Sequence, residues 1–236
     1  MVISFLFISR YFFLYSLDEL EDMEINHANQ QALAVIDMMV SQQESASYDW
    51  AYWDETYDLF VDRDIAKYTE RNLYTESIDA LNLDMMAFIT TNGQTLLSLT
   101  REDNPDTSSE LTAKMANQPI LQDYIKSMNH KLDIHRESIS GLFKINDTIW
   151  GLSLSPVRNS EGDRPSNGWM LWGRSLSLRF PGDFKSILTA ENSLETQMVS
   201  GSDSSEMRDI EKTSRSITKW ASLSDLSGEP IAWLKT

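Results

Sequence analysis

The chain has 236 residues, 41% of them hydrophobic, and is long enough to bury a sizeable core in one large domain or in a domain with appendages. Acidic residues outnumber basic ones by 36 to 20, and the formal net charge is −16. Nucleic acids and anionic lipids attract basic surfaces, so this charge argues against binding to either. There is no cysteine, which excludes disulfides, a thiolate nucleophile and cysteine-ligated metal sites.

Residues 1–17 are apolar and aromatic, with Arg10 as their only charge. The run is slightly shorter than the ~20 residues that cross a bilayer. It also lacks the basic start and the small-residue cleavage site of a removable signal peptide. We predict that it forms the outer part of a first transmembrane helix, with Arg10 reaching toward an interface. A buried or interfacial helix is the alternative.

The composition changes abruptly after residue 17, because residues 18–62 contain twelve Asp or Glu and no Lys or Arg. Cytoplasmic flanks of membrane helices are rich in Lys and Arg, so we place this part of the chain outside the cytoplasm. Apolar residues recur at helical spacing from Ala28 to Ala46, and no proline or glycine occurs before Gly93. We therefore expect one long helix, followed by helices that carry an aromatic motif.

Further along the chain the pattern alternates between helix and strand. A second helix is expected at 67–80, and a buried strand at 85–91 is followed by an Asn92-Gly93 hairpin turn and a partner strand at 95–100. The remaining expected elements are helices at 109–117, 119–129 and 183–192, and strands at 137–144, 148–157, 169–177, 196–199, 216–224 and 230–234. This order predicts an α+β fold with helices on one side of an antiparallel or mixed sheet.

The segment 47–60 packs six aromatic residues and four carboxylates into fourteen positions. On a continuous helix, Trp50, Trp53, Tyr57 and Phe60 would form one apolar stripe, and packing against the domain is the usual fate of such a stripe. The neighbouring acids suggest two alternatives. Aromatic faces and carboxylates together suit a cationic or amine ligand, and Asp54, Asp58 and Glu55 could hold a hard cation through oxygen.

The same segment carries a family resemblance. The pattern Asp49-Trp50-Ala51-x-Trp53-Asp54-x-x-Tyr57-Asp58-x-Phe60 closely resembles the signature of the fourth class of CHASE domains, which are extracytoplasmic sensory domains of bacterial receptors. Further matches follow in the order of that family, and the resemblance covers residues 20–180. They are Tyr68-x-x-x-Asn72-Leu73, Leu81-Asn82-Leu83-Asp84, Ser155-Pro156-Val157-x-Asn159-Ser160-x-Gly162 and Gly168-Trp169-x-Leu171-x-x-Gly173-Arg174.

The resemblance implies a ligand-sensing input domain of a membrane receptor, which signals by displacement of the long helix. It implies a long N-terminal helix followed by a PAS-like or Cache-like antiparallel sheet covered by helices. The expected divisions are a partial transmembrane helix at 1–17, the long helix and motif helices at 18–80, and the sensor core at 81–236. The expected location is the bacterial inner membrane, with residues after about 18 in the periplasm.

The expected partners are an unknown small-molecule ligand, the inner membrane and a second copy of the chain, which would form a homodimer through the long helix. No nucleic acid, cofactor or metal is expected, and no catalysis in this region. A cyclic-di-GMP enzyme or a histidine kinase is expected as a C-terminal output module. The alternative function is a membrane-anchored extracytoplasmic hydrolase that uses Asp54 and Asp58. Carboxylates four residues apart on one helix point the same way, whereas glycosidase carboxylates face each other across a substrate.

We expect the ligand to lie between the sheet and its covering helices, because aromatic walls with a few polar groups suit a small molecule. Arg174 closes an apolar strand, so its guanidinium could bind an anion or pair with a surface acid. His27, His130 and His135 have no metalloprotease spacing, and His130 and His135 are expected in surface loops. The predicted ligand-binding residues are Asp49, Trp53, Asp54, Tyr57, Phe88, Tyr124, Phe143, Trp150 and Arg174.

Overall fold

The computed structural model describes residues 2–73, 77–101, 105–128, 138–180, 182–195, 210–213 and 216–236. The chain forms two compact units. The first comprises Met1–Ile36, Arg179–Leu223 and Ala232–Thr236, and the second comprises Asp37–Leu178 and Ser224–Ile231. The predicted domain boundaries after residues 17 and 80 stay a prediction. His130, His135 and the strand expected at 196–199 lie outside the described residues.

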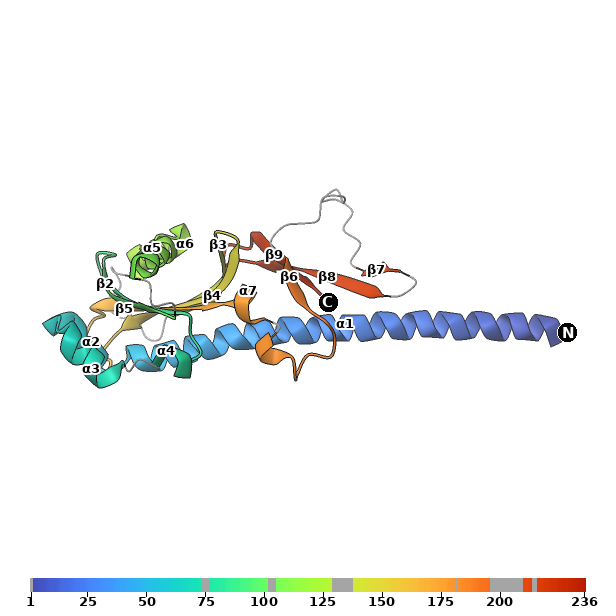
Figure 1. Ribbon diagram of the computed structural model, residues 1–236, viewed down its shortest axis with the longest axis horizontal. Helices are drawn as coiled ribbons and strands as arrows, with labels where there is room; N and C mark the ends of the chain where they lie inside the picture. Colours follow the sequence, from blue (N-terminus) through green and yellow to red (C-terminus); the bar gives the residue numbers. More distant parts are fainter. Residues whose placement is uncertain are drawn as a thin grey trace. The chain divides into compact units, whose positions relative to one another are not determined.

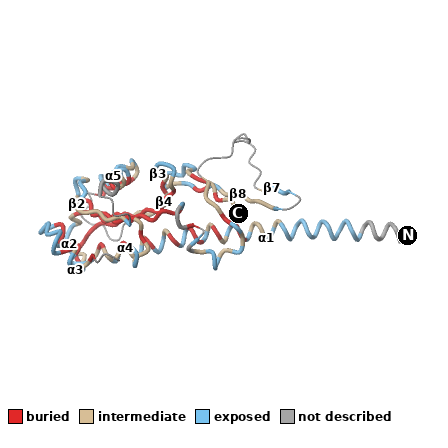
Figure 2. Tube along the Cα trace, viewed as in Figure 1, coloured by how far each residue is buried: buried red, intermediate tan, exposed pale blue. Residues whose placement is uncertain are grey.

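The second unit is built on a five-stranded sheet with the order β2-β1-β5-β4-β3 (Figure 1). Every neighbouring pair in this sheet is antiparallel. The strands are β1 (Met85–Thr90), β2 (Thr95–Thr100), β3 (Ile139–Ile145), β4 (Thr148–Val157) and β5 (Gly168–Ser175). All five strands were predicted, and Gly93 adopts φ 84° in the predicted turn between β1 and β2. The central strands β1 and β5 are almost entirely buried (Figure 2).

Alternation along the strands sends side chains to opposite faces of the sheet. On one face, Phe88 and Trp172 share a hydrophobic core with the end of α1 (Val2–Ala51), α2 (Asp54–Asp62), α3 (Ile65–Asn72) and α4 (Ser77–Ala80). On the other face, Trp169 and Leu171 share a core with α5 (Pro105–Ala116) and α6 (Pro119–Met128). The prediction of helices on one side is therefore wrong, because a sheet that is apolar on both faces needs a cover on each.

The first unit pairs the first part of α1 with strands from the end of the chain. These strands are β6 (Ser193–Glu195), β7 (Ile210–Lys212), β8 (Ile217–Ser224) and β9 (Pro230–Lys235), in the order β6-β9-β8-β7. Asn29 of α1 is buried and donates to the Thr236 hydroxyl over 2.9 Å, and that hydroxyl donates to Asn192 Oδ1 over 2.9 Å. A buried polar relay thus holds the end of β9 on α1.

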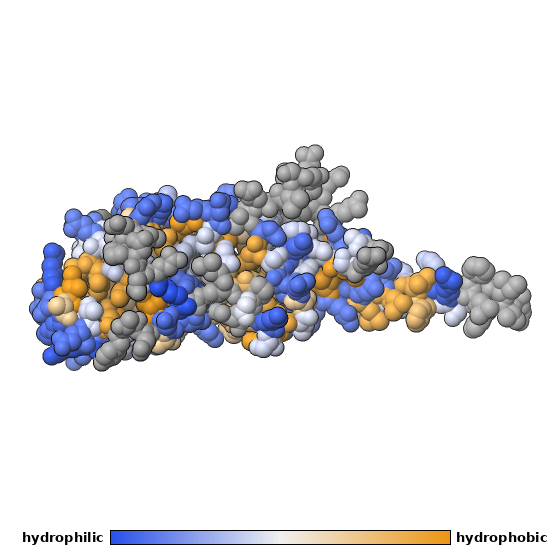
Figure 3. All heavy atoms as spheres, in the orientation of Figure 1, coloured by the Kyte–Doolittle hydropathy of each residue, from blue (hydrophilic) through white to orange (hydrophobic). Residues whose placement is uncertain are grey.

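The long N-terminal helix is confirmed, since α1 contains 50 residues. Exposed apolar side chains gather on the part of α1 between residues 11 and 20 (Figure 3); they are Tyr11, Phe12, Phe13, Leu14, Tyr15, Leu17 and Leu20. Across the described residues, none of the helices combines the length and the apolar character that a bilayer crossing needs.

The helix expected at 183–192 is wrong. The segment forms only a 3₁₀ turn, η1 (Gly182–Phe184), and then irregular structure. The carbonyl oxygen of Ile187 accepts a 2.9 Å hydrogen bond from the Gln31 side chain, which takes an acceptor that a helix would use for its own ladder. The Ile187 side chain is 47% exposed, so there is little apolar burial to stabilise a helix here.

Candidate functional site

The aromatic motif forms a sharp corner between α1 and α2. α1 ends at Ala51 and α2 begins at Asp54, so the four aromatic residues do not share one continuous helix. The corner is fastened to the loop after β4 by two hydrogen bonds. The Arg158 amide donates to the Ala51 carbonyl oxygen over 3.0 Å, and the Ser160 amide donates to Asp54 Oδ1 over 2.9 Å. These tertiary bonds offset the helical bonds that are lost at the break.

The motif aromatics divide between the core and the surface. Tyr57 and Phe60 are buried beneath α2 in the core that it shares with the sheet. Trp50 lies edge-on to Trp172 with ring centres 5.9 Å apart. Trp53 stacks on Trp50 at 4.7 Å and remains 39% exposed. Trp53 therefore lies at the surface of the corner, where a ligand could reach its free face.

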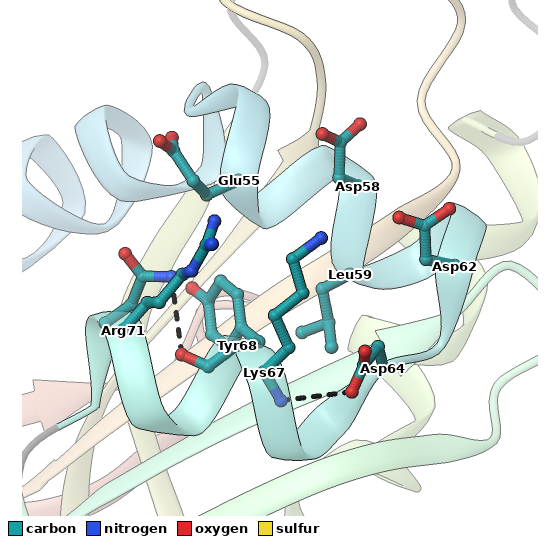
Figure 4. Close-up of a pocket in the computed structure, with 9 residues that line it drawn as sticks. Glu55, Asp58, Leu59, Asp62, Asp64, Lys67, Tyr68 and Arg71 are labelled. Carbon is teal, nitrogen blue, oxygen red and sulfur yellow. Dashed lines mark hydrogen bonds between the residues drawn. The ribbon is translucent and has the colours of Figure 1, made fainter.

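A charged groove lies between α2 and α3 (Figure 4). It contains about 360 Å³ of empty space, including the part open to solvent. The α2 wall carries three exposed acids, and the α3 wall carries two exposed bases that extend toward α2. The acids are Glu55, Asp58 and Asp62, and the bases are Lys67 and Arg71. Within the described part of the chain, no ion pair of 4 Å or less joins the two walls.

The base of the groove is held by Tyr68, which is buried and comes from α3. Its hydroxyl lies 3.0 Å from the hydroxyl of Thr56 on α2, so a buried hydrogen bond joins the two helices. The ring meets Phe88 edge-on at 5.4 Å. Burial raises the pKa of the Tyr68 phenol to about 12, with a smaller contribution in the same direction from the Glu55 charge and an opposing one from the Thr56 hydrogen bond.

The predicted sheet residues do not meet in one place. Phe88 faces the core under α2 and α3. Phe143 and Trp150 face the opposite core, under α5 and α6, and Tyr124 of α6 packs on Trp169 of that core with ring centres 5.7 Å apart. The sheet separates the two groups, so one small ligand would not touch both. A ligand role for either group stays a prediction.

Arg174 is buried and contacts main-chain carbonyls. Its Nε donates to the Asn82 carbonyl oxygen over 2.7 Å, and an Nη group lies 3.5 Å from the Leu81 carbonyl oxygen. The next amide, of Ser175, donates to Asp84 Oδ2 over 2.8 Å. These bonds join the Leu81–Asp84 motif to the Gly173-Arg174 motif. This contact, which the sequence did not reveal, gives Arg174 a structural task.

The alternative of a hard metal cation held by Asp54, Asp58 and Glu55 has no supporting geometry. In the described part of the chain, no three His, Asp or Glu side chains come together as metal ligands. The acids of the corner have other surroundings. Asp54 is hydrogen-bonded to Ser160, while Asp49 and Asp58 lie exposed on α1 and α2.

The sequence analysis did not identify Arg158, which occupies an unspecified position of the motif that begins at Ser155. Its only signal was a charge directly after an apolar ten-residue strand.

The solved structures that are similar to this chain include two extracytoplasmic domains. The extracellular domain of vpHK1S-Z8, a protein named as a histidine kinase, is 12% identical, with 93% of each chain covered and a TM-score of 0.54. The periplasmic domain of Vibrio cholerae LuxQ is also 12% identical, with 89% of this chain and 97% of that chain covered and a TM-score of 0.54. At this identity the likeness shows the fold, and the predicted α+β sensor fold is confirmed. No curated protein sequence matches the chain.

The family comparison bears on the motifs directly. The model of the CHASE4 domain family matches residues 35–194, which is well over half of the chain. The matched range contains the corner, the groove and the whole five-stranded sheet. The chain therefore belongs to the CHASE4 family, and the predicted resemblance to this class of extracytoplasmic sensory domains is confirmed.

Proposed function

We propose that this sensory domain detects a small zwitterionic molecule in the groove between α2 and α3 and reports the binding through α1. The observation that supports this is the arrangement of charge across the groove. Three acids line the α2 wall and two bases line the α3 wall, which also begins with the acid Asp64, and within the described residues no ion pair joins the two walls. A ligand with an ammonium group and a carboxylate would satisfy both walls, and charge-assisted hydrogen bonds are stronger than neutral ones.

The groove is well placed to act on α1. α2 begins three residues after the last residue of α1, and the corner between them is fastened at Asp54 and Ala51. A ligand that draws Lys67 and Asp58 together would favour a closed position of α2 relative to α3. The domain would then populate two states that differ at the end of α1, and the ligand would shift the balance by its difference in affinity for them.

The finer features of the receptor are also proposals. We propose anchoring in the bacterial inner membrane, a periplasmic position after about residue 18, a homodimer through α1, and a cyclic-di-GMP enzyme or a histidine kinase as output. The exposed aromatic residues of α1, which include Tyr11 and Tyr15, support contact with a membrane interface, where Tyr side chains are enriched. We assign no catalytic step to this region.

The test is thermal unfolding of the protein with a panel of amino acids, organic acids and amines. A ligand at 100 times its Kd stabilises the folded state by about 2.7 kcal/mol, so one class should raise the melting temperature clearly. Asp58→Asn and Lys67→Gln should each weaken the shift. The matched control is Lys126→Gln, which neutralises an exposed lysine on α6. If no compound shifts the wild type, a small-molecule input is refuted, and a protein partner or the membrane state becomes the signal to test.

A further inference from the structure

The loop at the corner holds a buried arginine, Arg158, that has no counterion in the described part of the chain. Arg158 follows β4 and is only 5% exposed. One Nη group lies 3.5 Å from the Gly162 carbonyl oxygen, a long contact, and Nε has no hydrogen-bond partner among the residues that the structure describes. Within the described residues, no carboxylate oxygen lies within 4 Å of its guanidinium.

A guanidinium in this setting is unusual on energetic grounds. Removing a cation from water costs several kcal/mol, and buried arginines are normally matched to a carboxylate or another acceptor. Two acids of the corner and its loop already accept hydrogen bonds. Asp54 accepts from the Ser160 amide, and Asp163 accepts from the Asn159 side chain over 2.6 Å. The unpaired Nε–H donor of Arg158 therefore indicates a hydrogen-bond acceptor that comes from outside the chain.

The surroundings of Arg158 indicate the kind of acceptor. Its amide is bonded to Ala51, and the Asp54 carboxylate is bonded two residues further along the same loop, so Trp53 lies between two points that are fastened to this loop. Trp53 is partly exposed and offers a flat apolar surface in the segment between these two fastened points. A guanidinium pairs best with a planar carboxylate, through two parallel hydrogen bonds.

We propose that Arg158 and Trp53 form an anion site at the α1–α2 corner, which takes the carboxylate of a small molecule on Arg158 and its flat apolar body on Trp53. The site lies outside the α2–α3 groove and does not depend on a ligand there. A bound carboxylate would accept the unpaired hydrogen bond of Arg158. It would thereby stabilise the contact between the loop after β4 and the end of α1. The corner would then respond to an anion independently of the groove.

The test uses the whole chain and three probes: benzoate, inorganic phosphate and neutral benzamide, at constant ionic strength. Benzoate should raise the melting temperature of the wild type and benzamide should not. Arg158→Gln should weaken benzoate binding at least about tenfold, a change of 1.4 kcal/mol. Arg164→Gln, which removes another arginine of the same loop, is the control and should bind benzoate as the wild type does. Trp53→Ala should weaken benzoate binding but leave any phosphate binding unchanged.

Two further arms separate the possible outcomes. If Arg158→Gln fails to fold, the Nε–H resonance of Arg158, identified by its loss in Arg158→Lys, should shift as benzoate is added to the wild type. A shift with phosphate alone would mean a site for inorganic anions and would overturn the carboxylate assignment. No response to any anion, together with equal destabilisation by Arg158→Gln and Glu161→Gln, would show an internal ion pair and overturn the proposal. Asp58→Asn should leave the benzoate response intact, which keeps this result separate from the groove.

Discussion

Replacing Gly168 with alanine should destabilise the protein, because the new methyl group would overlap the ring of Phe60. A Cβ atom at position 168 would lie 2.1 Å from Cε1 and 2.4 Å from Cδ1 of that ring. The ring is only 8% exposed and packs against Phe88 at 6.4 Å, so it has little room to move away. Overpacking of a core costs about 1–3 kcal/mol, and two overlapping ring atoms place this case toward the upper end.

The measurement is urea unfolding of the single variants and of the double variant with Phe60→Leu. Leucine removes the ring atoms that the new methyl group meets, so the double variant should be less destabilised than the sum of the two single variants. Gly182→Ala is the matched control, because none of the atoms that the structure describes lies within 4 Å of a Cβ atom there. Additive effects, or a cost for Gly168→Ala no larger than for Gly182→Ala, would refute the close contact between the motif helix and β5.

Three further variants test the assigned roles by urea unfolding. Arg174→Ala should lower the free energy of unfolding by about 1.5–3 kcal/mol, the range for a hydrogen bond to a charged group, because carbonyls at Leu81 and Asn82 lose their donor. Trp53→Ala should cost less than half of the ~3–5 kcal/mol of a core truncation, because the side chain is partly exposed. The pKa of Tyr68 is raised to about 12 in the folded protein. The contribution of its neutral phenol to the free energy of unfolding is therefore complete below pH 10 and is lost as the pH rises through 12. Tyr68→Phe should remove that alkaline loss of stability, and an unchanged pH dependence would contradict the assignment.

Local patterns predicted the strands well, for reasons visible in β1. Residues 85–89 are an unbroken apolar run, and such a run forms a strand that is buried on both faces. The turn that follows contains the one residue type that accepts φ 84° without strain, and a hairpin results. The family motif was equally informative about the fold, since it lies within the segment that the CHASE4 family matches.

The site was harder to predict because its geometry depends on contacts between distant segments. Phe88 and Phe143 both lie on apolar strands, but their faces depend on which helices cover each side of the sheet. The break at Tyr52 and Trp53 has no proline or glycine to mark it. It is stabilised by bonds to the loop after β4, about a hundred residues away in sequence. Arg174 is similar, because its carbonyl partners become neighbours only in the folded sheet.

These contacts suggest that several motif residues have mainly structural roles, and that the positions around the motifs are more open to change. Asp54 binds the amide of Ser160, Phe60 packs on Gly168, and Arg174 binds the carbonyl of Asn82. Each pair joins two motif segments, so the motif residues act mainly to hold the corner and the sheet together. Among the groups that we propose as ligand contacts, Asp58 and Trp53 are motif residues, whereas Lys67 and Arg158 occupy positions that the motifs leave open. Ligand preference should therefore change most readily by substitutions at such positions, with the fold preserved.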